Sequence, residues 1–182
     1  KTAIDTVLWL LNEGRRPETI RWIRPRDPWL LNRASFQPCR DHLVQILTGW
    51  AHEMDAAATA VDVDDLFLRW EAIGTMRRLD PTVTPSLFHC AFVSDGELAR
   101  LQKVRDVVRL GRVQRIDRER IVLERGEVST TLETLHIHCT AAGVPRVPTR
   151  PVFEPGRINL HYVRRCAPPF SAALIARVAA MD

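Results

Sequence analysis

The sequence predicts an α/β fold on the evidence of three patterns. Near the start of the chain, apolar residues recur at the spacing of one helix face, at Ile4, Val7, Leu8 and Leu11. A run rich in β-branched and aromatic residues, 19–24, then predicts a short strand. From Val107 the apolar spacing changes from helical to alternating, which predicts a small antiparallel β-meander. Helical and extended segments are therefore expected to share this chain of 182 residues.

The opening residues match the second half of a phosphate-binding motif, G-x-G-x-x-G/A. Lys1 and Thr2 stand at its two variable positions, and Ala3 stands at its third small position. A small residue there lets the helix approach its strand closely, while the helix N-terminus offers free N–H groups to a pyrophosphate. Gly14 then predicts the end of the helix. Loop, helix and strand in this order predict a partial Rossmann-type NAD(P)-binding unit over residues 1–34.

The end of the strand predicted at 19–24 carries candidate ligands for the adenosine ribose. In dinucleotide-binding units the residue that reads the ribose lies about 20 residues past the glycines. Arg24 and Arg26 stand here, and their guanidinium groups match the 2′-phosphate of NADP(H). Asp27 competes with this interpretation, because its carboxylate can read an unphosphorylated ribose or hold one of the arginines. Two solvated arginines on a polar loop are the third alternative.

The middle of the chain, 35–105, is predicted to be a helical insertion. Prolines within and beside 26–38 predict a loop or one broken helical turn before it. Helical spacing begins at Asp41, Asp62 is expected to cap a second helix, and a third is expected over 95–104.

The remainder, 106–182, is predicted to hold the β-meander, a returning strand and a C-terminal helix over 170–181. Alternating runs predict strands at 107–110, 111–116, 120–124 and 134–139. Turn signals separate them at 117–119 and at Gly126. A further turn into a strand is expected over 153–160.

The stretches KTAIDTVLWLL and IRWIRPRDPWLLNR resemble the NADP-binding insert of two-dinucleotide flavoproteins, which include flavin-containing monooxygenases and pyridine nucleotide-disulfide oxidoreductase-like enzymes. Such enzymes show G-x-G-x-[ST]-A-x-[DE] at the second nucleotide site, and Thr2, Ala3 and Asp5 match its second half. Their meander returns to a buried strand that ends in Ala-Thr-Gly. Here the corresponding residues end at Ala142 and Gly143, which the resemblance places beside the dinucleotide.

The resemblance implies the C-terminal fragment of a flavin-dependent oxidoreductase that binds NADP(H) and passes hydride to FAD. Its cofactors would be FAD and NADP, and its substrate a small molecule. The cofactors carry such chemistry, so no catalytic triad is expected. The sequence lacks a complete FAD fingerprint, and the remainder of a longer parent chain is therefore the expected partner. The alternative is a non-catalytic nucleotide-binding or interaction module.

Composition argues against several other classes of protein. The formal charge is +4, but acidic residues are interleaved with the basic ones, which disfavours a nucleic-acid surface. No apolar run is long enough for a membrane span. The four cysteines form no C-x-x-C pair, so reduced thiols in a cytoplasmic protein are expected and a zinc site is not. His136 and His138 would face away from Cys139 in a strand, which disfavours a metal site.

Overall fold

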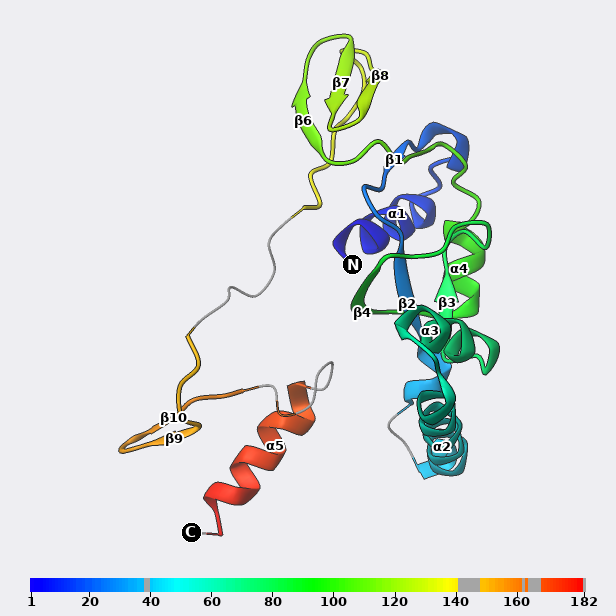
Figure 1. The fold of residues 1–182 in the computed structure, drawn as a ribbon. Helices are drawn as coiled ribbons and strands as arrows, with labels where there is room; N and C mark the ends of the chain where they lie inside the picture. The colour runs from blue at the N-terminus through cyan, green and yellow to red at the C-terminus, as the bar shows by residue number, and fades with distance from the viewer. Residues whose placement is uncertain (38–39, 141–147, 162, 164–167, 182) are drawn as a thin grey trace. The chain divides into compact units, whose positions relative to one another are not determined.

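The computed structural model describes residues 1–37, 40–140, 148–161, 163 and 168–181 (Figure 1). Helices and short sheets alternate along the described residues, which confirms the predicted mixed α/β class. The chain divides into two compact units, Lys1–Thr140 and Ala141–Asp182. The segment boundaries predicted near residues 34 and 105 fall inside the first unit.

Helix α1, Thr2–Asn12, forms where the apolar spacing predicts it. Ile4 and Val7 lie on its buried face, each 5% exposed, in a core cluster that also contains Trp22. Gly14 follows the helix with a φ of +79°. A glycine in the left-handed conformation just beyond the last turn is the predicted C-terminal stop, because other residues adopt that conformation at a cost.

Strands β1, Trp22–Ile23, and β5, Val107–Val108, form a parallel two-stranded sheet. The N–H group of Arg24 donates to the carbonyl oxygen of Val108 at 2.9 Å, so hydrogen bonding continues one residue past β1. The strand predicted over 19–24 is shorter in the structure, because a 3₁₀ turn, η1, occupies Pro17–Thr19. The pairing joins segments on either side of the predicted insertion.

A three-stranded sheet with the order β3-β2-β4 forms the centre of the first unit. Its strands are β2, Pro28–Asn32, β3, Met76–Arg78, and β4, Leu87–Val93. Strand β2 pairs in parallel with β4 and antiparallel with β3. The predicted insertion at 35–105 is therefore not only helical, since it contributes two of these strands.

The prediction of a loop or broken helical turn over 26–38 is wrong for 28–32, where β2 forms, whereas a short helical turn is present at Arg33–Phe36. Trp29, Leu30 and Leu31 are 3%, 0% and 4% exposed, so both faces of the strand are buried. A strand buried on both faces has a continuous apolar run in place of alternation. Pro28 is tolerated because it is the first residue of the strand.

The helices of the insertion follow the predicted order. They are η2, Arg33–Phe36, η3, Arg40–His42, α2, Leu43–Thr59, α3, Val63–Ala72, and α4, Asp95–Leu101. The side chain of Asp62 accepts a hydrogen bond from the N–H of Asp65 at 2.8 Å, which confirms the predicted cap of α3. Ser94 and Glu97 form a capping box at the start of α4.

A meander of three antiparallel strands is present: β6, Val113–Ile116, β7, Arg120–Leu123, and β8, Gly126–Ser129. The strands predicted at 111–116 and 120–124 correspond to β6 and β7, whereas β8 lies where only a turn was predicted, and the run at 107–110 pairs with β1. Ile121 and Leu123 form a small core with Val108 of β5. The strand predicted at 134–139 is absent from this described segment, which is largely exposed. Alternating side chains alone do not make a strand, because a strand also needs a neighbouring backbone with which to form hydrogen bonds. The central strand of the meander, β7, is already paired on both sides, by β6 and β8.

The second unit contains an antiparallel hairpin and a helix. Strands β9, Phe153–Glu154, and β10, Arg157–Ile158, are joined by a turn in which Gly156 has a φ of +70°. Helix α5 spans Pro168–Ala179, two residues earlier at each end than the predicted 170–181. No helix in the described part of the chain is both long and apolar enough to cross a membrane.

Two cysteines are described. Cys139 is a free thiol, whereas Cys90 of β4 is disulfide-bonded. The prediction of reduced thiols throughout the chain is therefore wrong for Cys90, because spacing along the sequence does not reveal which distant cysteines meet.

Candidate nucleotide site at the carboxyl ends of β1 and β5

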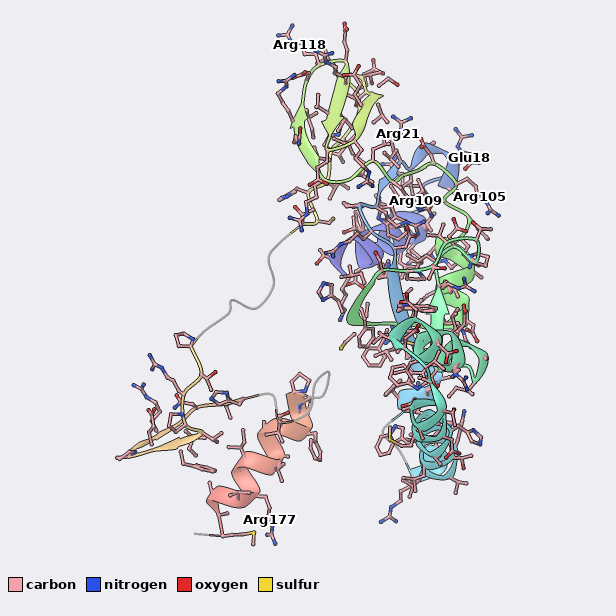
Figure 2. The ribbon with its side chains drawn as sticks, in the orientation of Figure 1. Glu18, Arg21, Arg105, Arg109, Arg118 and Arg177 are labelled. Atoms are coloured by element: carbon pink, nitrogen blue, oxygen red, sulfur yellow. The ribbon has the colours of Figure 1, made fainter. Side chains whose placement is uncertain are left out.

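Arginine residues follow both strands of the parallel pair. Arg24 comes directly after β1, and Arg109 comes directly after β5. Because parallel strands end at the same edge of a sheet, these two side chains are brought together there. Figure 2 labels Arg109 within the first unit. In open α/β sheets ligands bind outside the carboxyl ends of the strands, so this edge is the candidate site.

Two carboxylates join these arginines into one ion-paired network, which we name the Asp27 cluster: Arg24, Asp27, Asp80 and Arg109. Arg24 Nη2 lies 3.1 Å from Asp27 Oδ1. Arg109 donates from Nε to Asp27 Oδ2 at 2.8 Å and from Nη2 to Asp27 Oδ1 at 3.3 Å. Arg109 Nη2 also donates to Asp80 Oδ2 at 2.8 Å. The cluster is formally neutral, with two guanidinium groups and two carboxylates.

Burial differs across the Asp27 cluster. The side chains of Arg24 and Asp27 are 7% and 6% exposed, whereas those of Arg109 and Asp80 are 33% and 29% exposed. Arg24 and Asp27 thus form the inner part of the cluster, and Arg109 partly covers them from solvent. A buried carboxylate requires such partners, because an uncompensated buried charge is strongly unfavourable.

The environment changes the pKa values of three members. Burial lowers the pKa of the Arg24 guanidinium, and the Asp27 carboxylate opposes that change. Hydrogen bonding to Asp27 raises the pKa of Arg109. Hydrogen bonds from Thr82 lower the pKa of Asp80. Arg24 and Arg109 both remain cations, since an arginine starts from a pKa far above neutrality.

The position of Arg24 is fixed by more than its ion pair. Its guanidinium carbon lies 5.0 Å from the ring centroid of Trp22, in a cation–π arrangement. Its Nε atom is buried and has no hydrogen-bond partner among the described residues.

Arg26 lies in the turn between the two inner members of the cluster. It is exposed and has no ion pair among the described residues. Of the two arginines predicted from the sequence, Arg24 is therefore engaged by Asp27, and Arg26 carries the available charge. The sequence also offered the alternative that Asp27 holds one of the arginines, and the ion pair between Arg24 and Asp27 matches that alternative.

The other predicted contacts lie at the start of α1. Lys1 is its N-cap residue without a side-chain cap, and Thr2 and Ala3 form its first turn. Ala3 packs against the core cluster that includes Trp22. No hydrogen bond or ion pair between described residues joins Lys1, Thr2 or Ala3 to Arg24 or Arg26. Ala142 and Gly143 lie outside the described residues.

The segment that precedes Ala142 does lie beside α1. Thr6 Oγ1 and Cys139 Sγ are 3.5 Å apart, across 133 positions of sequence. Cys139 therefore contacts helix α1, although 134–139 does not form the predicted strand.

Sequence reasoning missed Arg109 and Asp80. For Arg109 a signal existed, since Val107-Val108-Arg109 repeats the arrangement of Trp22-Ile23-Arg24, apolar strand residues followed by arginine. This similarity was overlooked because the alternating pattern placed 107–110 in the antiparallel meander, whereas β5 pairs with β1. Asp80 gave no signal. Among the described residues no group of His, Cys, Asp or Glu is arranged to hold a metal ion.

Comparison with known proteins gives relatives without an assigned activity. One protein of Mycobacterium bovis and two of Mycobacterium tuberculosis strains, all named as uncharacterized, are each 45% identical to this chain over 178 residues. The match covers 98% of this chain and 33% of each relative, so the chain spans about a third of their length. No family model matches the chain, and no solved structure matches it.

Proposed function

We propose that this chain is the NADP(H)-binding part of a flavin-dependent oxidoreductase that passes hydride to FAD. The observation that carries the proposal is the parallel pairing of β1 with β5. Helix α1 precedes β1 in the chain, and Arg24 and Arg109 directly follow the two strands. Helix, strand and parallel neighbour in this order are the elements of a Rossmann-type unit. The antiparallel meander β6-β7-β8 follows β5 directly, as in the resembling flavoproteins.

The charge at this edge favours NADP(H) over NAD(H). The Asp27 cluster is neutral, and exposed Arg26 adds one positive charge beside it. A 2′-phosphate is attracted by an unpaired guanidinium, which presents several donors in a planar fork. Asp27 does not oppose the phosphate, because Arg109 donates to both its oxygens and Arg24 forms an ion pair with Oδ1.

The start of α1 would hold the pyrophosphate. The first N–H groups of a helix have no partner within the helix, and its N-terminus carries a partial positive charge. Lys1 adds an exposed cation there, and Thr2 a hydroxyl. In this proposal the chain binds and orients NADP(H), and the bound cofactor supplies the hydride.

FAD enters the proposal through the family resemblance. The chain contains no G-x-G-x-x-G sequence, so its residues do not form the usual phosphate loop for FAD. In a protein as long as the mycobacterial relatives, that loop would be contributed by other residues.

Calorimetric titration of the complete gene product with NADPH, NADH, 2′-AMP and 5′-AMP tests the proposal. We expect NADPH to bind more tightly than NADH, and 2′-AMP more tightly than 5′-AMP, because the discriminating group is the 2′-phosphate. Absence of binding by all four compounds would contradict the proposed function. Binding without NADPH oxidation in the presence of FAD would favour the non-catalytic module.

A further inference from the structure

Asp27 occupies the place at which NAD(H)-binding proteins carry a carboxylate. An acidic side chain after the second strand of a Rossmann-type unit accepts hydrogen bonds from the ribose 2′-hydroxyl and repels a 2′-phosphate. Asp27 is three residues past the end of the β1 ladder at Arg24. Its side chain is 6% exposed, so it does not present a free carboxylate to a ligand.

Arg109 is the residue that covers this carboxylate. Its Nε is the donor to Asp27 Oδ2 at 2.8 Å, whereas Arg24 pairs with Oδ1. Arg109 is 33% exposed and Arg24 is 7% exposed, so Arg109 is the more solvent-accessible of the two arginines that pair with Asp27. Removing the Arg109 guanidinium would leave Oδ2 without its donor and open to solvent.

We propose that Arg109 determines the choice between NADP(H) and NAD(H) by occupying the carboxylate of Asp27. This inference rests on the proposed function. With Arg109 present, three guanidinium groups face two carboxylates and the site carries one net positive charge. Without it, the site is neutral and Asp27 Oδ2 becomes an acceptor at the ribose. A 2′-phosphate is then disfavoured, and a 2′-hydroxyl is favoured.

Asp80 holds the other end of Arg109. Its Oδ2 accepts from Arg109 Nη2 at 2.8 Å, and its Oδ1 accepts from the Thr82 N–H at 3.0 Å and hydroxyl at 2.6 Å. The loop before β4 therefore anchors Arg109 in the orientation that covers Asp27. Arg109 and Asp80 act as positioning residues, since neither must touch the cofactor in this arrangement.

The test compares dissociation constants for NADPH and NADH in variants of the complete gene product. In Arg109→Gln the ratio that favours NADPH is expected to fall about tenfold or more, the factor for one charge-assisted contact. Arg109→Lys is expected to restore part of the preference, because the ammonium keeps the charge but loses the fork. Arg118→Gln is the matched control and is expected to keep the wild-type ratio, since Arg118 lies in the exposed turn between β6 and β7.

The double variant Asp27→Asn/Arg109→Gln separates covering of Asp27 from direct contact with the phosphate. It has no Asp27 carboxylate to expose, and the amide oxygen introduced at position 27 can still accept from the Arg24 guanidinium. We expect its NADPH preference to be close to that of the wild type. This variant also decides the question if Arg109→Gln alone does not fold.

Two results would overturn the role of Arg109 and leave the proposed function standing. One is a folded Arg109→Gln protein that keeps the wild-type NADPH to NADH ratio. The other is a double variant whose preference falls well below that of the wild type, because the loss then belongs to Arg109 itself. A wild-type protein that binds neither dinucleotide would contradict the proposed function, and this inference with it.

Discussion

Asp27 and Arg109 are 82 positions apart in the chain and are joined by two hydrogen bonds, of 2.8 and 3.3 Å. Asp27 lies just after β1 and Arg109 just after β5, so this ion pair connects the segments that follow the two strands of the parallel sheet. Arg24 and Arg109 are both engaged by Asp27, whereas Arg26 is exposed and available to a ligand.

Arg24 and Arg26 are expected to respond differently to substitution. Arg26→Ala should weaken NADPH binding by about 1.5–3 kcal/mol, the value for a hydrogen bond to a charged group. Its stability should change by less than about 0.5 kcal/mol, because the side chain is exposed. Arg24→Ala should reduce the free energy of unfolding by about 1–3 kcal/mol, since Asp27 loses one of its two partners. Calorimetric titration and urea denaturation measure the two effects. Equal loss of NADPH and NADH affinity in Arg26→Ala would contradict a 2′-phosphate contact.

The burial of β2 predicts a large effect at its centre. Leu30 is fully buried, and Leu30→Ala should lower the free energy of unfolding by about 2–5 kcal/mol, because it removes packed atoms and leaves a cavity. Leu132→Ala is the control, since Leu132 is 78% exposed and should change stability little. Denaturant titration of both variants checks this. Similar small effects would show that 28–32 is a surface segment.

Gly111 is expected to tolerate no side chain. Its φ is +86°, and a Cβ atom would lie 2.8 Å from the Cβ of Glu124. Gly111→Ala should therefore destabilise the meander by about 1–3 kcal/mol, through backbone strain and the close contact. Gly49→Ala in helix α2 is the matched control, because that position has open space and should gain up to about 1 kcal/mol. Thermal denaturation of the pair measures the contrast, and a stable Gly111→Ala variant would contradict the left-handed conformation and close packing at Gly111.

The capping box of α4 predicts a pH-dependent stability. The backbone N–H of Ser94, followed by its hydroxyl and by Arg33, lowers the pKa of Glu97 below its ordinary value. A carboxyl group whose pKa is lower in the folded state stabilises the protein above its unfolded-state pKa, about 4.3. That contribution is lost as the pH falls through the folded-state pKa.

Glu97→Gln should therefore be less stable than the wild type at neutral pH, and the difference should shrink on acidification below pH about 4.3. Urea denaturation across this range measures it. Ser94→Ala should cost about 1 kcal/mol at neutral pH. A difference between wild type and Glu97→Gln that does not depend on pH would assign the effect to the shape of the side chain.

Much of the fold follows from local patterns in the sequence. The spacing of Ile4 and Val7 predicted α1, Asp62 predicted the start of α3, and alternation predicted β6 and β7 of the meander. Each of these signals acts over a few residues. Strand β2 was missed because neighbouring prolines suggested a loop, although a continuous apolar run is equally typical of a buried strand.

The site was less predictable, because its contacts join distant segments. Arg24 and Asp27 could be named as candidates from their position after a strand, but the partners of Asp27 come from other loops. Only the pairing of β1 with β5 brings Arg109 to Asp27. For the same reason the disulfide of Cys90 could not be read from cysteine spacing.

Anaerobic addition of NADPH to the complete gene product, purified and supplied with FAD, tests the central proposal most directly. The measurement is the visible absorption of bound flavin, followed over time with NADPH and, separately, with NADH. We expect bound flavin that NADPH bleaches, with NADH less effective at equal concentration. A protein that retains no FAD, or whose flavin absorption does not respond to either dinucleotide, would contradict the assignment to a flavin-dependent oxidoreductase.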